Sequence, residues 1–380
     1  MSSFVQSLVV GAGVVGLSAA RLLAKAGREV LLVEKSSRVC LGVSSRNSGV
    51  VHAGLYYERG SLKASTCVEG SWMLHRFAQM YNVPLKKCGK LVVAMDKGED
   101  AKLQIMYMRA IGLGARDIVL LDGEDTLRIE PSLKQSVAGA IWSPHTAVID
   151  PVMYGEALLA DSRGSNFTFS AKSEVVKIDY STLDRLFTVE FADGERIRCQ
   201  ELVNAAGLYA TQIAGCIKGL KVPQIRYKKG SYFALKAPSP FQRLVYPMRR
   251  AGRHLGIHTV IDPVSDSIKF GPDSVDLNIS EMPDSSSLFT VDPMDAPKFR
   301  AAVERYWEDV PSVEHFVPDF AGIRPTSIHG DFVLDQHGIP GYVGLYGIDS
   351  PGLTASLSLA HRVGDLLGVT GITTPEMQPQ

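Results

Sequence analysis

The sequence contains little cysteine, and this scarcity excludes several kinds of site. Its 380 residues include five cysteines, and no two of them form a Cys-x-x-Cys pair. Zinc sites and disulfide frameworks depend on clustered cysteines, so we expect no metal and a reducing compartment. A net charge of either sign is also absent, because Lys and Arg together number 40, as do Asp and Glu. The chain therefore has no overall basic field that would favour nucleic acid.

Long apolar runs and targeting signals are missing as well. No apolar run approaches the roughly 18 to 20 residues that span a bilayer. The first predicted strand begins within the first few residues, so we expect no N-terminal targeting peptide and a cytoplasmic or mitochondrial location. Hydrophobic residues make up 45% of the chain and charged residues 21%. This composition is typical of a globular protein, and the length is sufficient for two domains.

A dinucleotide-binding pattern lies near the start of the chain. An apolar run over residues 8–10 leads into G-x-G-x-x-G at Gly11, Gly13 and Gly16, and an apolar helix follows. A second apolar run ends at Glu34, about 20 residues further on. The spacing predicts a βαβ unit in which Gly11 permits a tight turn, Gly13 lets a pyrophosphate approach and Gly16 lets the helix pack closely. Glu34 is placed to accept hydrogen bonds from a ribose.

Two further segments are rich in glycine and small polar residues. Residues 42–49 form a polar loop soon after the dinucleotide motif, and we expect this loop to touch the cofactor. Near the C-terminus the apolar run 343–347 meets a Gly/Pro/Ser turn, and a helix is predicted over 353–367. The apolar run 201–207 also ends in glycine. Strand-to-helix turns at both ends of the chain indicate one cofactor domain assembled from separated segments.

The middle of the chain alternates apolar and polar residues, which is typical of antiparallel sheet. Helices are predicted over 61–81, 100–110 and 295–308, and another begins at Pro151. Four of the predicted strands, 231–235, 244–246, 256–259 and 268–271, are expected to share one antiparallel sheet within residues 222–275. The predicted strands are 90–94, 138–142, 147–149, 174–178, 186–191, 197–199, 231–235, 244–246, 256–259 and 268–271.

These patterns together predict a mixed α/β (α+β) fold. We expect a Rossmann-like FAD-binding domain with an inserted antiparallel-sheet substrate domain. The cofactor domain is expected to comprise residues 1–85, 145–215 and 320–380, and the substrate domain residues 86–144 and 216–319.

The chain resembles the FAD-dependent oxidoreductases of the D-amino-acid-oxidase superfamily. The blocks that carry this resemblance are Gly11–Gly16 with Glu34, Val175-Val176, Leu202–Gly207 and Gly347–Thr354. Within the superfamily, the run 45–57 (SRNSGVVHAGLYY) is similar to the signature of the L-2-hydroxyglutarate dehydrogenases. The chain departs from that family's pattern at residues 248–250 and at Pro325, which leaves the exact hydroxy acid open.

The resemblance implies FAD as the cofactor, and it implies which residues hold it. They belong to the dinucleotide motif, the polar loop, two strands that end near the cofactor and the C-terminal turn. The residues are Gly11, Gly13, Val14, Val15, Gly16, Glu34, Lys35, Ser45, Arg46, Asn47, Ser48, Val176, Ala206, Gly207, Gly347, Ile348, Ser350, Gly352, Leu353 and Thr354.

Oxidation of a 2-hydroxy acid requires a base for the hydroxyl proton and a cation for the carboxylate. His52 and His258 are the candidate bases, because histidine titrates near neutral pH. For His52, a structural role and covalent attachment of the flavin remain open. Arg324 is the candidate carboxylate clamp, because a guanidinium can hold both oxygens; a surface ion pair is its alternative.

Three more residues are expected to contact substrate. Tyr56 and Tyr246 are predicted to line the pocket, with the hydrophobic core as their alternative place. Arg249 is predicted to meet a distal anionic group, with a solvated turn as its alternative.

The resemblance implies a FAD-dependent dehydrogenase that oxidises a small L-2-hydroxy acid at its CH–OH group, by hydride transfer to flavin N5. L-2-hydroxyglutarate, oxidised to 2-oxoglutarate, is the first candidate substrate. A glycerol-3-phosphate dehydrogenase, a glycine/sarcosine-type amine oxidase and a flavin-binding protein without turnover stay open. The electron acceptor also stays open among oxygen, a quinone and a carrier protein.

Overall fold

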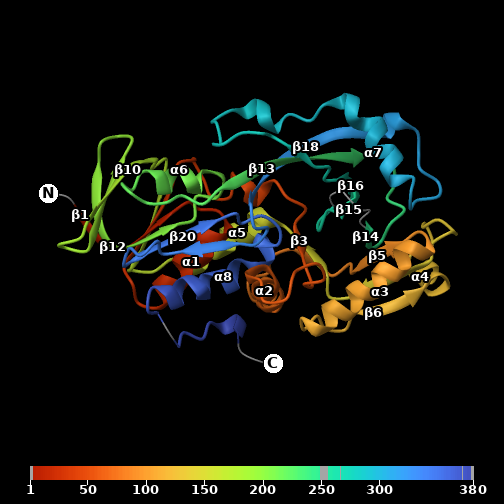
Figure 1. Ribbon diagram of the computed structural model, residues 1–380, viewed down its shortest axis with the longest axis horizontal. Helices are drawn as coiled ribbons and strands as arrows, with labels where there is room; N and C mark the ends of the chain where they lie inside the picture. The colour runs from red at the N-terminus through yellow and green to blue at the C-terminus, as the bar shows by residue number, and fades with distance from the viewer. Residues whose placement is uncertain (1–2, 249–255, 266, 370, 378–380) are drawn as a thin grey trace.

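The computed structural model describes residues 3–248, 256–265, 267–369 and 371–377, and it confirms the mixed α/β fold (Figure 1). Its largest sheet has eight strands. The five parallel strands of this sheet are β1 (Ser3–Val10), β2 (Val30–Glu34), β9 (Phe167–Ala171), β12 (Arg196–Asn204) and β20 (Tyr342–Tyr346). The hairpin of β10 (Val175–Ser181) and β11 (Leu186–Phe191) pairs antiparallel with β12, and β19 (Val333–Asp335) pairs with β20.

Four helices pack around the parallel strands and bury the main hydrophobic core. They are α1 (Val14–Lys25), α2 (Leu62–Met80), α5 (Pro151–Ser162) and α8 (Gly352–Leu366). Local sequence explains where α2 and α5 begin. The Ser61 hydroxyl accepts a hydrogen bond from the Ala64 amide, and Asp150 caps a helix whose first residue is Pro151. The helices predicted from residues 61, 151 and 353 are thus confirmed within a residue or two of their starts.

The remaining strands form three smaller sheets. A five-stranded sheet contains β13 (Ile225–Leu235), β15 (His258–Ile261), β16 (Ile268–Gly271), β17 (Val275–Asp276) and β18 (Phe316–Ser327). A four-stranded sheet contains β5 (Lys90–Ala94), β6 (Val119–Asp122), β7 (Gly139–Ser143) and β14 (Leu244–Pro247). The third contains β3 (Val50–Val51), β4 (Leu85–Lys86) and β8 (Ala147–Ile149). The other helices are α3 (Lys97–Gly112), α4 (Gly123–Ile129), α6 (Ala210–Gly215) and α7 (Ala296–Val303).

Three expectations about single elements are wrong. Residues 244–246 do not join the sheet of β13, because β14 pairs parallel with β5. Residues 197–199 and 201–204 form one strand, β12, whose polar first half pairs with β11 and whose buried second half pairs with β20. The helix predicted to residue 308 ends at Val303, although Tyr306 and Trp307 remain buried. Alternation reports which face is buried, but it does not identify the partner strand.

One predicted domain boundary, between residues 319 and 320, falls inside a continuous strand. β18 runs through the boundary at residues 319 and 320 and pairs along its length with β13. The eight-stranded sheet draws its strands from three separated parts of the chain, as Figure 1 shows. The division into two domains stays a prediction.

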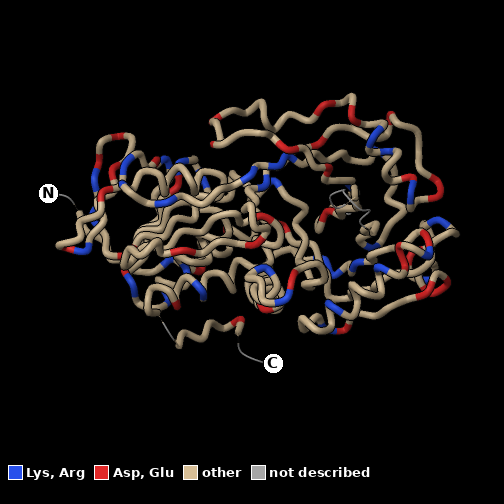
Figure 2. The backbone as a smooth tube through the Cα atoms, in the orientation of Figure 1, with Lys and Arg blue, Asp and Glu red and all other residues tan. Residues whose placement is uncertain are grey.

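Charge and hydropathy are mixed along the described chain. Figure 2 shows Lys and Arg interspersed with Asp and Glu over both halves of the molecule.

Among the described residues, no helix combines the length and the apolar character needed to cross a bilayer. No group of three or more His, Cys, Asp or Glu side chains in the described part of the chain is arranged to hold a metal ion.

Candidate active site

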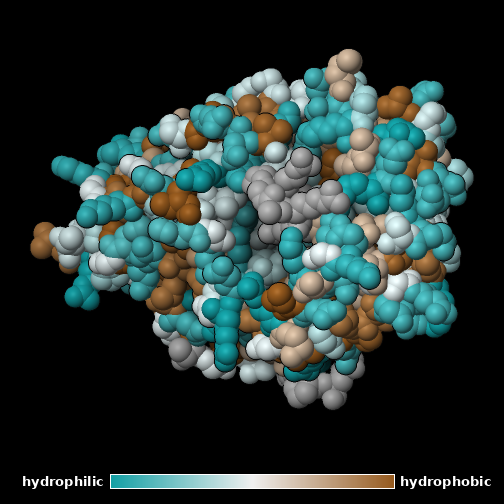
Figure 3. Space-filling view, turned by 45° about the vertical axis from the view of Figure 1, so that its right-hand side comes forward, coloured by the Kyte–Doolittle hydropathy of each residue, from teal (hydrophilic) through white to brown (hydrophobic). Residues whose placement is uncertain are grey.

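A cavity of about 830 Å³ extends from the end of β1 to the sheet of β13. Its walls come from the β1–α1 turn, the end of β2, the polar loop, the turn after β12, and the turn between β20 and α8. The start of β10, the helix α6, the segment 282–289 and the strands β13, β14, β15 and β18 also contribute. Figure 3 shows the molecular surface hollowed near the middle of one face. The cavity therefore joins the expected dinucleotide motif to the expected substrate residues.

The glycines of the motif make the dinucleotide end possible. Gly11 has φ +100°, and a Cβ on it would lie 2.6 Å from the Ala205 carbonyl oxygen. A Cβ on Gly16 would lie 1.9 Å from the Gly11 carbonyl oxygen, so only glycine lets α1 pack this closely. Gly13 caps α1 without a side chain. The Val14 amide in the first turn donates to the Ser44 hydroxyl at 3.0 Å, and the positive end of the helix lies at the cavity wall, where its dipole favours a pyrophosphate.

Glu34 is held in place at the end of β2. Its Oε2 accepts a hydrogen bond from the Ala12 amide at 2.8 Å, and its Oε1 accepts one from the Ser36 amide at 2.9 Å. Each carboxylate oxygen can accept a second hydrogen bond. Because Glu34 lines the cavity, these remaining lone pairs suit the two hydroxyls of a ribose.

The polar loop owes its shape to its own side chains. The Asn47 amide nitrogen donates to the carbonyls of Val43 and Ser44, and its oxygen accepts from the Gly49 amide at 2.7 Å. The Ser48 hydroxyl lies 2.9 Å from the Tyr232 hydroxyl across the cavity wall. Asn47 and Ser48 thus fix the wall, and both also line the cavity.

The C-terminal turn is anchored by a buried ion pair beneath it. Lys63 Nζ lies 2.6 Å from Asp349 Oδ1, and the Thr326 hydroxyl donates to Asp349 Oδ2 at 3.1 Å. Burial raises the pKa of Asp349, although Lys63 opposes this shift. The residues Ile348, Ser350, Gly352 and Leu353 line the cavity from this turn.

Most of the predicted cofactor residues line the cavity, and five of them do not. Those on its wall are Gly11, Gly13, Val14, Val15, Glu34, Lys35, Arg46, Asn47, Ser48, Ala206, Gly207, Ile348, Ser350, Gly352 and Leu353. Those away from its wall are Gly16, Ser45, Val176, Gly347 and Thr354.

Val176 does not lie on the cavity wall, whereas its neighbour Val175 does. The pairing of β10 with β11 shifts register between Val175 and Lys177. As a result Val175 is buried on the cavity wall, whereas the Val176 side chain is 47% exposed. A bulge reverses which side chains face inward, and alternation along a single strand does not reveal it.

Ser45 and Thr354 have structural partners instead. The Ser45 hydroxyl donates to the Gly42 carbonyl within the polar loop. The Thr354 hydroxyl donates to the Val50 carbonyl at 3.1 Å and accepts from the His52 amide at 3.0 Å. Thr354 therefore positions His52 from the first turn of α8.

The substrate end of the cavity brings the predicted catalytic side chains together. Its wall includes His52, Tyr232, Tyr246, His258 and Arg324. They come from distant parts of the chain: the segment after β3, and the strands β13, β14, β15 and β18. Tyr232 was not predicted, because it is one of several aromatics in an apolar strand.

Arg324 lies on β18 opposite Lys228 of β13. Its Nη2 donates to the Asp273 carbonyl at 3.0 Å. Space for the guanidinium depends on Gly230, since a Cβ there would lie 3.0 Å from Arg324 Nη2. This single backbone contact orients the guanidinium and leaves other N–H groups for an anion in the cavity.

His258 is neutral and has a defined tautomer. It is 3% exposed, and burial lowers its pKa to about 3, with Lys90 and Arg324 adding to the effect. Its Nδ1 lies 3.0 Å from the Thr259 carbonyl oxygen, which can only accept. Nδ1 therefore carries the proton, and Nε2 keeps its lone pair. The ring stacks on Tyr246 with centroids 3.8 Å apart.

His52 is neutral as well. Burial lowers its pKa well below the usual range, and Lys90 and His258 lower it further. Its Nε2 lies 3.3 Å from the Ser350 hydroxyl. Its Nδ1 is buried without a hydrogen-bond partner among the residues that the structure describes. Both imidazoles are therefore unprotonated at neutral pH, as a base must be, and the lowered pKa makes each a weaker base than free histidine.

The remaining substrate predictions have separate outcomes. Tyr246 lines the cavity. Tyr56 packs in the hydrophobic cluster that contains Tyr246. Its side chain is described by the structure, but it does not line the cavity. Arg249 lies outside the described residues, as do Arg250 and Arg253.

Lys90 is a residue that the sequence analysis did not identify. It begins β5, where a lysine reads as the polar end of an apolar strand. In the folded protein its side chain is fully buried, and its Nζ lies 5.1 Å from the ring centroids of both Tyr56 and Tyr246. The sequence feature that could have indicated the burial of Lys90 is its position directly before four apolar residues.

The fold and the site are those of a dinucleotide-binding protein whose cavity wall also carries an arginine and two neutral histidines. The family model described as FAD dependent oxidoreductase (DAO) matches residues 7–366. This chain belongs to that family, and it is an enzyme that uses FAD.

Particular relatives are similar over most of the chain. The mitochondrial L-2-hydroxyglutarate dehydrogenase of Arabidopsis thaliana is 34% identical, over 95% of this chain and 83% of its own. The glycerol 3-phosphate dehydrogenase of Caloramator mitchellensis is 27% identical, over 94% of this chain and 73% of its own. The FAD-bound L-α-glycerophosphate oxidase of Mycoplasma pneumoniae has the same fold, with TM-score 0.87 and 22% identity over 98% and 97% of the two chains.

Proposed function

We propose that this enzyme oxidises L-2-hydroxyglutarate to 2-oxoglutarate. The observation that carries the proposal is the wall formed by Arg324 with two neutral histidines, His52 and His258. A 2-hydroxy acid offers a carboxylate to the arginine and a hydroxyl proton to an imidazole. The relation to the Arabidopsis enzyme, which is named for this substrate, supports the same reading.

Each residue has a defined task in this reaction. Arg324 holds the substrate carboxylate, because its guanidinium is oriented by the Asp273 carbonyl and still has free N–H groups. His258 or His52 accepts the hydroxyl proton; the protonated Nδ1 of His258 leaves Nε2 as the accepting atom. Bound FAD supplies the two-electron acceptor for the substrate C–H bond. Tyr246 holds the His258 ring by stacking against it.

The cofactor-binding residues follow from the cavity wall. We assign the pyrophosphate to Gly11, Gly13 and the start of α1, and the ribose to Glu34. The turn between β20 and α8 also lines the cavity, and we assign the flavin ring edge to it, because its amides and the α8 dipole favour an anion. Gly16 contributes by close packing rather than by contact.

Glycerol 3-phosphate is the second candidate substrate. It is supported by the relation to the Caloramator enzyme, and its phosphate would use the same Arg324. A glycine/sarcosine-type amine has weaker support, because an amine can arrive already deprotonated and would not need two neutral imidazoles beside it.

Anaerobic bleaching of the bound flavin tests these candidates together. Holoenzyme is mixed with L-2-hydroxyglutarate, other 2-hydroxy acids, glycerol 3-phosphate, glycine or sarcosine, and the flavin absorbance is followed. We expect the fastest bleaching with L-2-hydroxyglutarate. Faster bleaching by glycerol 3-phosphate or an amine would reject the proposal, and no bleaching by any compound would favour a binding protein.

The electron acceptor and the compartment are further proposals. Reoxidation of the bleached enzyme by oxygen, by a soluble quinone or by a carrier protein would rank the three acceptors. We retain the cytoplasm or the mitochondrion as the location; the Arabidopsis relative is named as a mitochondrial protein.

A further inference from the structure

Lys90 has a buried position that is unusual for a lysine. The side chain has 0% exposure, and Nζ makes no hydrogen bond to any residue that the structure describes. The rings of Tyr56 and Tyr246 lie beside it, each with its centroid 5.1 Å from Nζ. Aromatic faces attract a cation, but they do not neutralise it.

Among the residues that the structure describes, no carboxylate lies beside Lys90 to balance its charge. The surrounding titratable groups come from five elements: Tyr56 and His52 from the segment after β3, Cys67 from α2, Cys88 before β5, Tyr246 from β14, and His258 from β15. Burial raises the pKa of Cys67 to about 12, so this thiol is neutral at pH 7. Burial also raises the pKa of Cys88 and lowers the pKa of both histidines. In the described structure Lys90 is therefore a cation among neutral neighbours.

A buried cation without a counter-charge destabilises a protein, because its lost hydration is not replaced. Burial accordingly lowers the pKa of Lys90 to about 8. At pH 7 the ammonium still predominates, so its positive potential reaches the cavity through Tyr246 and His258. Tyr246 links the two regions, since its ring faces Lys90, stacks on His258 and lines the cavity.

We propose that Lys90 is a positioning residue that determines substrate specificity: its buried ammonium, behind the wall of Tyr246 and His258, selects a substrate that carries a second negative charge. Arg324 holds one carboxylate, and Lys90 supplies a field that favours a dianion over a monoanion of the same length. This inference rests on the proposed function, because it explains why a dicarboxylate is preferred to a simple hydroxy acid. Lys90 acts through space and through the Tyr246 ring, without contact with substrate.

A binding measurement tests the inference without requiring turnover. Glutarate and pentanoate have five carbons each and differ by one carboxylate, and neither carries a 2-hydroxyl. Their dissociation constants for the FAD-loaded enzyme are measured from the change in the flavin spectrum, for wild type and for Lys90→Met. We expect the preference for glutarate over pentanoate to fall about tenfold in Lys90→Met. An unchanged preference in a folded Lys90→Met protein would overturn the inference.

The matched control removes a different lysine. Lys269 lies on β16, and its Nζ is already paired with Asp319 Oδ2 at 2.7 Å. Lys269→Met makes the same change in net charge, but it should leave the preference for glutarate unchanged. An equal loss in both variants would show a nonspecific effect of net charge and would overturn the role of Lys90.

The pH dependence separates an electrostatic role from a structural one. In wild type the preference for glutarate should fall as the pH rises above about 8, because Lys90 loses its proton there; bound dianion moves this transition to higher pH. In Lys90→Met the preference should not change over the same range. A transition that persists in Lys90→Met would assign it to another group and would count against the inference.

Thermal unfolding provides a second measurement. Methionine has a similar length and no charge, so Lys90→Met should unfold at a higher temperature than wild type at pH 7. A lower unfolding temperature would mean that the ammonium has a stabilising partner, and the inference would fail. The bleaching and binding experiments can give different answers. If no 2-hydroxy acid bleaches the flavin, the proposed function fails. If wild type still prefers glutarate and Lys90→Met does not, the role of Lys90 stands.

Discussion

At the scale of single residues, the substrate end of the cavity combines positive charge with neutral bases. Arg324 and Lys90 carry the charge, while His52 and His258 are kept neutral by burial and by these cations. In the proposed reaction the cations would perform two tasks: they would attract an anionic substrate, and they would prevent protonation of the groups that accept its proton. Removing one cation should therefore change both binding and the pH profile.

The clamp is tested by replacing Arg324 with alanine. We expect a sharp rise in KM together with a lower kcat, because the guanidinium both binds the carboxylate and orients the reacting carbon. Arg324→Lys should restore little, since one ammonium does not hold two oxygens in a plane. Steady-state kinetics with L-2-hydroxyglutarate measure both constants.

The control for this variant is Arg226→Ala. Arg226 is an exposed arginine on β13 that pairs with Thr326 of β18. It should keep wild-type KM and kcat. Wild-type kinetics in Arg324→Ala would mean that another cation holds the carboxylate.

The candidate bases are tested by their pH dependence. A lowered histidine pKa means that the unprotonated form persists to lower pH. The acidic limb of kcat/KM should therefore lie well below pH 6.5, rather than at the value of free histidine. Replacing the true base with glutamine should reduce kcat/KM by about 10²- to 10⁴-fold and flatten that limb.

The two histidines serve as controls for each other. One of the two variants replaces the histidine that is not the base. That variant should lose less activity and keep the acidic limb of kcat/KM. If His52→Gln and His258→Gln both retain near-full activity, neither residue is the base, and the amine-oxidase alternative gains support.

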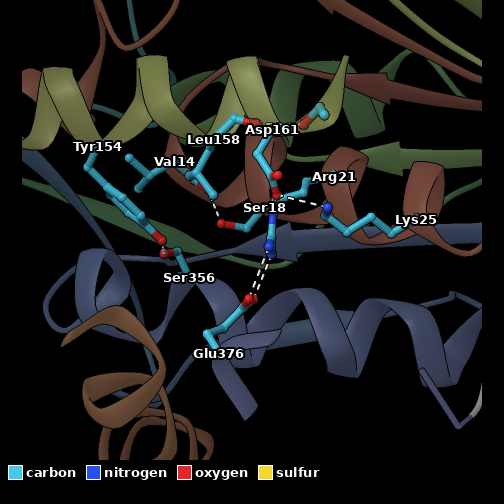
Figure 4. Close-up of polar contacts among 10 residues, drawn as sticks. Val14, Ser18, Arg21, Lys25, Tyr154, Leu158, Asp161, Ser356 and Glu376 are labelled. Carbon is cyan, nitrogen blue, oxygen red and sulfur yellow. Dashed lines mark hydrogen bonds and ion pairs between the residues drawn. The ribbon is translucent and has the colours of Figure 1, made fainter. Parts of the chain in front are cut away.

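At the scale of elements, the described C-terminal segment is attached to α1 and α5 by a buried ion cluster. Arg21 of α1 bonds Asp161 of α5 through Nε at 2.6 Å, and it bonds both carboxylate oxygens of Glu376 at 2.6 and 3.0 Å. Figure 4 shows Arg21 between the two acids, with Lys25 also directed at Asp161. Burial alone would raise the pKa of Glu376, but Arg21 outweighs it and lowers that pKa.

This cluster predicts a large loss of stability in Glu376→Gln. The variant keeps the size of the side chain but leaves Arg21 with less of its counter-charge in a buried place. We expect the free energy of unfolding to fall by about 3 to 5 kcal/mol, as for other broken buried ion pairs. Urea denaturation followed by circular dichroism measures this change.

An exposed ion pair gives the comparison. Arg128 pairs with Glu124 and Asp125 on the surface of α4. Arg128→Ala should leave the urea midpoint unchanged, because solvent screens such pairs. A Glu376→Gln protein as stable as wild type would show that the C-terminal segment is not anchored by this cluster.

At the scale of the whole molecule, the cavity joins separated parts of the chain. Its wall draws on the eight-stranded sheet, on the sheet of β13 and on β14, so ligands that fill the cavity would link several sheets. A ligand that binds only the folded state raises its stability by an amount set by concentration and affinity. The fold should therefore depend on FAD.

Glu34→Ala tests this dependence. We expect FAD to bind more weakly by about 1 to 3 kcal/mol, because charged hydrogen bonds to the ribose are lost. The unfolding temperature in excess FAD should fall toward that of the FAD-free protein. The FAD-free forms of Glu34→Ala and wild type provide the reference for any effect of the substitution itself. Equal FAD affinities would show that Glu34 does not bind the ribose.

Part of the fold and site could be predicted because it depends on neighbouring residues. The G-x-G-x-x-G turn is required by local sterics, as the close approaches at Gly11 and Gly16 show. The caps at Ser61 and Asp150 likewise act within one turn of helix. Fifteen of the twenty predicted cofactor residues line one cavity, because the motifs that contain them have characteristic shapes.

The sequence by itself determined the cofactor motif, the family and the residue types expected at the substrate end of the cavity. Only the tertiary structure decided that β14 pairs with β5, that Val175 rather than Val176 faces inward, and that Lys90 lies buried beside the site. It also decided that both histidines are neutral. Motif geometry depends on residues a few positions apart, whereas strand partners, burial and pKa depend on residues that meet only after the chain has folded.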